Sequence, residues 1–245
     1  MASTICRLLP YAAAPGARNM AADEALLERA AAGIASVRFY GWSEATVSLG
    51  YFQLERLRYE DSKVAQLPYV RRPTGGATLV HHYEVTYALA LPSGPPWQVG
   101  DPWLPRMHKL VAGALESLDV RTRIHVADGR EANSGMLCFQ HLTAGDLLID
   151  AAKIVGSAQR RQRGALLQHG AILLARSPYA PDLSGIQELS QRVLSTEEVV
   201  KAVTRMFAQQ TGWDLVAADW TVDEIERIAQ LVAGKYSRDE WNCKR

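Results

Sequence analysis

The chain has 245 residues, of which 48% are hydrophobic and 22% charged, as is typical of a globular protein with an apolar core. The formal net charge is only +1, so the sequence lacks the basic excess of a nucleic-acid-binding protein. No apolar run reaches the roughly 18 residues of a membrane-spanning helix, so no membrane partner is expected either.

The first half of the chain begins with a predicted helix over residues 19–33, with Asn19 as its N-cap and Gly33 just beyond its end. Because Pro10 and Pro15 interrupt the preceding segment, we interpret that segment as the start of the fold and not as a signal peptide. Strands are expected at "SVRFYGW" (36–42) and "ATVSLGYF" (45–52). Residues 69–92 predict a strand, a Gly-rich turn and two further strands, of which "VTYALAL" (85–91) is a central one.

The second half begins with an amphipathic helix, "WLPRMHKLVAGALESL" (103–118), followed by a strand at "VRTRIHV" (120–126) and a loop at "ADGREANSG" (127–135). Short strands are expected at "MLCFQ", "DLLIDAAKIVGSAQ" and "ALLQHGAILLA" between residues 136 and 175. Two capping boxes, Ser195 with Glu198 and Thr221 with Glu224, then open helices, the first ending near Gly212. The pattern predicts an α+β fold with a mixed β-sheet core flanked by helices, because it lacks the regular βαβ alternation of a Rossmann fold.

The Gly-rich run "RRPTGGATLVHH" (71–82) is not a phosphate-binding loop, because no Lys-Ser/Thr follows its glycines. Its paired glycines allow the backbone to approach a ligand closely, and the two arginines place donors beside it. We expect those arginines to bind either the carbonyl end of a substrate or a docking partner. The alternative is a hairpin turn with two solvated arginines. The adjacent His81 and His82 point to opposite faces of a strand, so no metal site is predicted.

Two residues of the run 137–170 are candidates for chemistry. Cys138, between Leu137 and Phe139, is either a buried apolar cysteine or a nucleophile. Lys153 begins an apolar strand and either lies along a narrow slot or extends its ammonium group to the surface. The small Gly156 and Ser157 leave room for a ligand, or else allow close packing of strands. The cysteines at 6, 138 and 243 are widely spaced, which favours free thiols and a cytoplasmic protein.

These segments resemble the lipoate/biotin protein ligase superfamily, and within it the LipM-type octanoyltransferases most. The resemblance rests on "NMAADEALL", "VRFYGW", "TVSLGYFQ", "RRPTGGATLVHHYEVTYAL", "KIVGSAQRRQRGALLQHGAILL" and "KYSRDEWNCKR", which occur in the family's order across nearly the whole chain. It implies one biotin/lipoate ligase-type catalytic domain over residues 1–245, with a largely helical C-terminal third from about residue 178. It also implies transfer of an octanoyl group from acyl carrier protein to a lysine of a lipoyl-accepting protein, with no cofactor.

The resemblance also implies roles for particular residues. Cys138 matches the acyl-accepting cysteine, and Lys153 matches the lysine at the acyl carbonyl. His82 and Ala77 depart from the family, which usually has Asp at the first position and Gly or Arg at the second, so the hydrogen bonding of this loop is in doubt. The substrate pocket is expected to be lined by Arg72, Thr74, Gly75, Gly76, His81, Gly156, Ser157, Ala158 and His169.

The implied chemistry needs a thiolate, a clamp for the carbonyl and an apolar tunnel. A thioester donor is already activated, so no nucleotide is required. The ammonium of Lys153 would favour the thiolate and stabilise the oxyanion. The proton of the attacking amine is accepted by His169, or by Lys153 if Lys153 has first lost its own proton. The arginines at 160, 161 and 163 either dock an acidic carrier protein or form a solvated turn.

Three alternatives to octanoyl transfer from a carrier protein stay open. An ATP-dependent lipoate–protein ligase would use the same loop for an adenylate. An octanoyl amidotransferase would use Cys138 to move the group between lipoyl proteins, such as the glycine-cleavage H protein and dehydrogenase E2 subunits. A binding module without catalysis would keep the tunnel and need no nucleophile.

Overall fold

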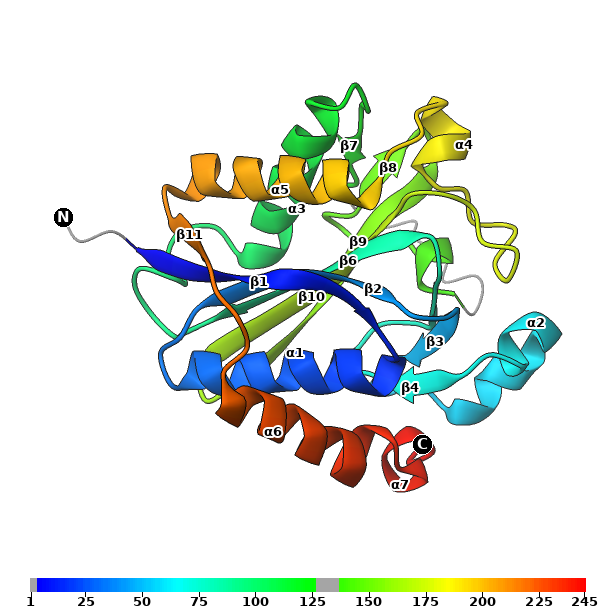
Figure 1. Ribbon diagram of the computed structural model, residues 1–245. Helices are drawn as coiled ribbons and strands as arrows, with labels where there is room; N and C mark the ends of the chain where they lie inside the picture. Colours follow the sequence, from blue (N-terminus) through cyan, green and yellow to red (C-terminus); the bar gives the residue numbers. More distant parts are fainter. Residues whose placement is uncertain (1–3, 127–136) are drawn as a thin grey trace.

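The computed structural model describes residues 4–126 and 137–245, and it forms three layers with a mixed eight-stranded sheet in the middle (Figure 1). The strand order is β11-β1-β2-β6-β10-β9-β8-β7, with β11, β1 and β2 parallel and the remaining pairs antiparallel. In Figure 1, α3 and α5 lie above this sheet and α1 and α6 below it. The predicted fold class, a mixed sheet flanked by helices, is therefore confirmed.

The main elements follow one another in a mixed order along the chain. The strands of the large sheet are β1 (Ile5–Ala14), β2 (Ser36–Trp42), β6 (Glu84–Leu91), β7 (Arg123–Ile124), β8 (Leu147–Ile149), β9 (Ala152–Gln162), β10 (Ala165–Leu173) and β11 (Asp214–Ala217). A small sheet contains β3 (Thr46–Leu49), β4 (Tyr69–Arg71) and β5 (Leu79–His81). The helices are α1 (Gly16–Ala31), η1 (Glu55–Glu60), α2 (Ser62–Ala65), α3 (Trp103–Glu116), η2 (Cys138–Gln140), α4 (Ile186–Ser190), α5 (Thr196–Thr211), α6 (Val222–Leu231), η3 (Val232–Tyr236) and α7 (Asp239–Asn242).

The central strands of the large sheet, β2, β6 and β10, are buried on both faces, and strand alternation divides their apolar side chains between two cores. On β6, Tyr87 and Leu89 belong to the core under α3 and α5, whereas Ala88 and Ala90 belong to the core with α1. This alternation is the period-two pattern of a strand covered on both sides. The small alanines bring α1 close to the sheet, and α1 carries polar residues that reach the centre of the molecule.

The small sheet holds the Gly-rich run next to the large sheet. β3 pairs in parallel with β4 and antiparallel with β5, so residues 72–78 form the connection between two strands that are not neighbours. Gly76 has a φ of +90°, which a side-chain-bearing residue adopts only with strain. The predicted hairpin turn is therefore a wide loop, and this loop covers one side of a cavity described below.

Local sequence signals placed most helix ends correctly. Both capping boxes form, with Ser195 accepting from the Glu198 N–H and Thr221 from the Glu224 N–H. Gly212 ends α5 with a positive φ, as expected. Asn19 is not an N-cap, however: the helix begins three residues earlier, and the Asn19 amide donates to the carbonyls of Ala14 and Gly41.

Two other expectations are wrong. "MLCFQ" is not a strand from Leu137 onward, because Cys138 begins the 3₁₀ helix η2 and only an isolated bridge joins Leu137 to Thr78. The strand expected at 120–126 is reduced to β7, which has two residues. The loop expected at 127–135 lies outside the described residues.

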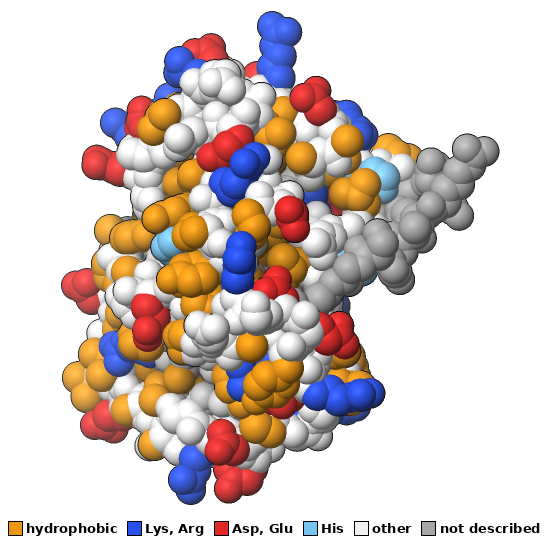
Figure 2. Space-filling view, turned by 90° about the vertical axis from the view of Figure 1, so that its right-hand side faces the viewer, with side chains coloured by type: hydrophobic (Ala, Val, Ile, Leu, Met, Phe, Trp, Pro, Cys, Tyr) orange, Lys and Arg blue, Asp and Glu red, His pale blue; other side chains and the backbone are white. Residues whose placement is uncertain are grey.

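The face of the molecule drawn in Figure 2 is mixed in charge. Figure 2 shows Lys and Arg side chains interspersed with Asp and Glu, and hydrophobic side chains exposed between them, as the net charge of +1 suggests. Within the described ranges, no helix is long and apolar enough to cross a bilayer.

Candidate active site

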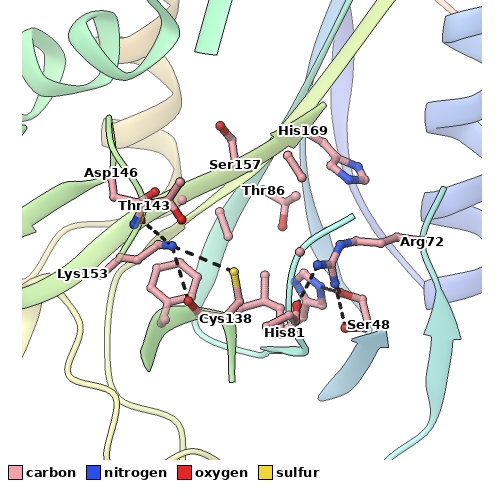
Figure 3. A pocket seen from close by; sticks show the side chains of 18 of the residues that line it. Ser48, Arg72, His81, Thr86, Cys138, Thr143, Asp146, Lys153, Ser157 and His169 are labelled. Atoms are coloured by element: carbon pink, nitrogen blue, oxygen red, sulfur yellow. Dashed lines mark hydrogen bonds and ion pairs between the residues drawn. The ribbon is translucent and has the colours of Figure 1, made fainter. Parts of the chain in front are cut away.

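A cavity of about 530 Å³ lies between the two sheets, and residues far apart in the sequence form its wall (Figure 3). Its size falls within the range typical of small-molecule sites. The described lining residues are Met20, Tyr40, Ser48, Arg72, Gly76, Ala77, Leu79, His81, Thr86, Leu104, Cys138, Phe139, His141, Thr143, Asp146, Lys153, Gly156, Ser157, Ala158, His169, Gly170 and Ala171.

Cys138 and Lys153 converge on this wall, as the family resemblance implied. Lys153 is the second residue of β9, and its Nζ lies 4.0 Å from the Cys138 Sγ. The same ammonium donates to the backbone carbonyls of His141 at 3.1 Å and Cys138 at 3.4 Å. Cys138 is half-buried in η2, and its N–H donates to the Thr78 carbonyl at 2.5 Å, so the thiol is held in place but remains accessible. A nucleophile and a cation therefore share one edge of the cavity.

Asp146 is a member of this cluster that the sequence analysis missed. Its Oδ2 lies 2.7 Å from Lys153 Nζ, and both side chains are almost completely buried. The same oxygen accepts from the Thr143 N–H at 2.7 Å, which fixes the carboxylate. The sequence shows only an acid ahead of an apolar strand, and nothing local indicates that it pairs with a lysine seven residues later.

Gly156 makes room for the bent path of the lysine side chain. A Cβ at this position would lie 2.5 Å from Cε and 2.9 Å from Nζ of Lys153. Lys153 therefore crosses the strand surface where Gly156 has no side chain. Any larger residue at position 156 would displace the Lys153 ammonium, so this position requires glycine.

Of the two arginines of the Gly-rich run, Arg72 lines the cavity and Arg71 does not, and both guanidinium groups donate to backbone carbonyls. Arg71 is completely buried, and its guanidinium donates to the carbonyls of Asn242, Gly50 and Gln53 at 2.8, 2.9 and 2.6 Å. Arg72 donates to the carbonyls of Ser48, Gly75 and Ala77 at 2.9, 2.8 and 2.7 Å. Both side chains therefore stabilise the backbone. Arg71 binds the C-terminal segment at Asn242, and Arg72 binds the loop at Gly75 and Ala77. The alternative of a turn with two solvated arginines is wrong, since both side chains are buried.

His81 and His82 point to opposite sides, as the strand pattern required. The His81 ring stacks on Trp42 with centroids 3.7 Å apart, and its Nε2 lies 2.8 Å from Ser48 Oγ. Burial lowers the pKa of His81, although Glu84 at its Nδ1 acts in the other direction. His82 lies outside the cavity, with Nδ1 3.1 Å from Ser177 Oγ. Its departure from the family pattern therefore leaves the cavity wall unaffected.

His169 belongs to a buried network that includes an acid from α1. Its Nδ1–H donates to Asp23 Oδ2 at 2.8 Å, and its Nε2 lies 2.6 Å from Thr74 Oγ1. Asp23 also accepts from Arg38 Nε at 3.0 Å and from the Tyr40 hydroxyl at 2.9 Å. Burial alone would raise the pKa of the Asp23 carboxyl, but Arg38, His169 and Tyr40 together hold it below its ordinary value. Asp23 lies three and four residues before Leu26 and Leu27, so it shares their apolar helix face. An acid on such a face is the sequence feature that could have indicated its burial.

We predict that Asp23→Asn lowers the free energy of unfolding near neutral pH by about 3 kcal/mol, because it leaves the buried Arg38 without its anion. Since the folded-state pKa of Asp23 is depressed, its stabilisation is present above the unfolded-state value of about 3.9 and is lost as the pH falls through the folded-state value. Urea unfolding at several pH values should show that the free energy of unfolding falls less on acidification in the variant than in the wild type. An Asn variant as stable as the wild type at pH 7 would contradict the assignment.

A second network supports the wall from the side of α3. Ser157 Oγ lies 2.8 Å from His108 Nε2, and the other ring nitrogen donates to the Gly145 carbonyl at 2.6 Å. Burial lowers the pKa of His108, which favours the neutral ring, and in that form Nε2 accepts from the Ser157 hydroxyl. His108 thus links β9 to the turn that carries Asp146, and so it helps to position the Lys153 ammonium.

Most residues predicted for the site do line the cavity: nine of the eleven are in its wall. Thr74 and Gly75 are the exceptions. The Thr74 hydroxyl points toward His169 and not into the cavity. Gly75 is half-buried, and a Cβ added to it would lie 3.8 Å from the nearest atom of the Phe52 ring. Within residues 4–126 and 137–245, no group of three or more His, Cys, Asp or Glu side chains is arranged to hold a metal ion.

The sequence and the fold of this chain are similar to those of known proteins. The lipoyl protein ligase A/B catalytic-domain family matches residues 15–209. An octanoyltransferase named LipM from Geobacillus kaustophilus is 32% identical over 283 aligned residues, which cover 100% of both chains. The LipM of Anoxybacillus flavithermus is 33% identical, covering 93% of this chain and 94% of its own.

Solved structures share the fold. A putative lipoate protein ligase from T. acidophilum with bound lipoic acid has a TM-score of 0.77 at 22% identity, covering 98% of this chain and 99% of its own. A lipoate-protein ligase A bound with ATP has a TM-score of 0.78 at 23% identity, covering 97% of this chain and 98% of its own. These matches extend over the whole arrangement of sheets and helices.

Proposed function

The chain belongs to the lipoyl protein ligase A/B catalytic-domain family and is an acyltransferase, and we propose that it transfers an octanoyl group from a carrier-protein thioester to a lysine of a lipoyl-accepting protein. The single observation that supports this proposal most is the 4.0 Å separation of Cys138 Sγ and Lys153 Nζ at the cavity wall. In the proposed reaction Cys138 carries the acyl group as a thioester. The prediction of one catalytic domain over residues 1–245 is part of this proposal.

In the first half-reaction the Cys138 thiolate attacks the carbonyl carbon of the donor thioester. A new C–S bond forms to Cys138, the C–S bond to the carrier breaks, and the carrier leaves as a thiolate. The Lys153 ammonium stabilises the oxyanion of the tetrahedral intermediate, because it is a fixed and almost completely buried donor. Its contacts to Asp146 and to the His141 carbonyl hold it in position before the substrate arrives.

In the second half-reaction the neutral amine of the acceptor lysine attacks the acyl-Cys138 carbonyl. A C–N bond forms, the C–S bond to Cys138 breaks, and one proton leaves the amine. Of the two candidate bases, Lys153 is the one in contact with Cys138. The contacts of His169 to Asp23 and Thr74 engage both ring nitrogens in the wall. Lys153, held as an ammonium by Asp146, has no lone pair for a proton, so we assign the proton of the amine to the leaving Cys138 thiolate, which becomes the thiol again.

The cavity wall suits a medium-length acyl tail. Besides the charged cluster, it contains apolar groups from Met20, Leu79, Leu104, Phe139 and Ala171. Burying the methylenes of an octanoyl chain contributes roughly 5 kcal/mol, at about 0.8 kcal/mol for each CH₂. That is sufficient to favour medium over short chains, whereas a single methylene is discriminated only weakly.

The proposed partners are an octanoyl-carrier protein as donor and lipoyl-domain proteins, such as the glycine-cleavage H protein or dehydrogenase E2 subunits, as acceptors. The proposed chemistry takes its energy from the donor thioester and therefore consumes no nucleotide. A ligase would instead release pyrophosphate from ATP, and an amidotransferase would accept an octanoylated lipoyl protein as donor.

The test is a transfer assay without ATP, in which purified protein, octanoyl-carrier protein and an apo lipoyl domain are mixed and the acceptor mass is followed. We expect one octanoyl group on the acceptor lysine, at a rate that added ATP leaves unchanged. Parallel reactions contain free octanoate or lipoate with ATP, or an octanoylated H protein as donor. Transfer that requires ATP, or that occurs only from the octanoylated H protein, would refute the proposal.

A further inference from the structure

An aromatic and basic patch lies on the outer side of the loop that lines the cavity. Phe52 is 70% exposed, which is unusual for so large an apolar side chain, and its ring stacks edge-on against Tyr51. The Lys244 ammonium lies 3.6 Å from the Tyr51 ring centre and 3.4 Å from the Trp241 ring centre. The Arg245 guanidinium lies 5.3 Å from the Phe52 ring centre. We call Tyr51, Phe52, Arg160, Trp241, Lys244 and Arg245 the outer patch.

Among the residues that the structure describes, the cations of the outer patch have no anionic side chain as an ion-pair partner. No ion pair between described residues includes Arg160, Lys244 or Arg245, although Lys235 next to them pairs with Glu24. Burial, and then the charges of Arg71, Lys235, Arg245 and Arg160, lower the pKa of Lys244 to about 8. Lys244 therefore lies among other cations, on a protein whose net charge is only +1.

The outer patch is tied to the cavity loop by direct hydrogen bonds. The Tyr51 N–H donates to the Thr74 carbonyl at 2.8 Å, and Arg160 Nη1 donates to the Pro73 carbonyl at 3.1 Å. Arg161 points elsewhere and donates to Gln98, and Arg163 lies at the β9–β10 turn. Of the three arginines considered in the sequence, only Arg160 therefore belongs to this surface.

We propose that the outer patch docks the acidic surface of the acyl-carrier protein that donates the octanoyl group. Exposed aromatic residues and arginines next to unpaired positive charge are the composition of a protein interface that recognises an acidic partner. This inference rests on the proposed function, because it names the surface that brings the donor to Cys138.

The position of the patch favours the donor over the acceptor as its occupant. Arg160 and Lys153 are seven residues apart on β9, which corresponds to roughly 23 Å along a strand. A carrier protein bears its acyl group on a long phosphopantetheine arm, so its body docks at a distance from the reacting carbonyl. An acceptor presents a short lysine side chain, so its surface must lie close to Cys138.

The experiment measures binding and transfer separately. The double charge reversal Lys244→Glu/Arg245→Glu is compared with wild type and with Lys201→Glu/Arg205→Glu, which changes the same charges on exposed positions of α5. In Figure 1, α5 lies across the large sheet from the C-terminal end, so this control leaves the outer patch intact. The milder Lys244→Gln/Arg245→Gln variant is included, and each variant is checked by thermal unfolding.

We expect the outer-patch reversal to raise the Kd for the carrier protein about tenfold or more, and the Gln variant to raise it less. The wild-type Kd should increase with salt concentration, and the α5 control should match the wild type. In transfer, kcat/KM with octanoyl-carrier protein should fall, whereas octanoyl-pantetheine, which has the thioester without the protein, should react equally well with all variants.

An unchanged Kd for the carrier protein in the reversal variant would overturn the inference, even if octanoyl transfer itself is confirmed. A rise in KM for the lipoyl acceptor without a change for the donor would also overturn it and assign the patch to the acceptor. Conversely, if the wild type transfers from neither donor but the reversal still weakens carrier binding, the docking surface stands and the proposed reaction fails.

Discussion

Octanoyl transfer by Cys138→Ala is expected to be at least about 1,000-fold slower than by the wild type, because the variant lacks the atom that accepts the acyl group. Cys138 is half-buried and its backbone is held by the Thr78 carbonyl, so the substitution should change stability little. The measurement is kcat/KM with an octanoyl-thioester donor and an apo lipoyl domain. The loss should appear with a carrier-protein donor and with octanoyl-pantetheine alike.

The matched control is Cys243→Ala, which removes an exposed thiol whose sulfur lies 3.1 Å from the Tyr69 hydroxyl, away from the cavity wall. This variant should retain wild-type kcat and lose only the reactivity of the exposed thiol toward alkylating reagents. If Cys138→Ala kept a rate close to that of the wild type, the acyl group would have to pass directly from donor to acceptor.

Lys153→Met is expected to lower kcat by about 100- to 1,000-fold, which is the usual loss when one donor to an oxyanion is removed. The side chains have similar length, so methionine should fill the same space beside Gly156. The substitution also leaves the Asp146 carboxylate buried without its cation, which should cost about 3 kcal/mol of folding stability. A fall in activity alone would therefore be ambiguous, and a second variant is needed.

The double variant Lys153→Met/Asp146→Asn separates the two effects. The asparagine introduced at position 146 retains an oxygen that can accept from the Thr143 N–H but carries no charge, so much of the lost stability should return. The activity should not return, because the ammonium at the carbonyl is still missing. Recovery of kcat together with stability would show that Lys153 is only a structural partner of Asp146.

Much of the fold could be predicted because its signals are local. The capping boxes at Ser195 and Thr221, the glycine at 212 and the apolar strand 85–91 each depend on a few neighbouring residues. β1 was missed because Pro10 lies inside it, and a proline argues against a regular strand. The structure accommodates Pro10 at a shift in the pairing of β1 with β2 between Leu9 and Ala12.

The site was predicted less completely, because its contacts join residues that are distant in the sequence. The pairing of Asp23 with His169 joins α1 to β10, and no local pattern reports such a contact. Arg71 shows the opposite error: its sequence context suggested a ligand, whereas the tertiary fold uses its guanidinium to hold the backbone around Asn242 and Gly50. The positions of Cys138 and Lys153 were expected from the family resemblance, and the turn that presents the thiol was not.

The most direct test of the account is mass spectrometry of the intact protein after incubation with an octanoyl-thioester donor, without ATP and without acceptor. We predict a mass increase of one octanoyl group, located by peptide mapping on Cys138 and labile to hydroxylamine. The adduct should disappear when an apo lipoyl domain is added, as the same group appears on the acceptor lysine. Transfer to the acceptor with no acyl adduct ever formed on Cys138 would contradict the account.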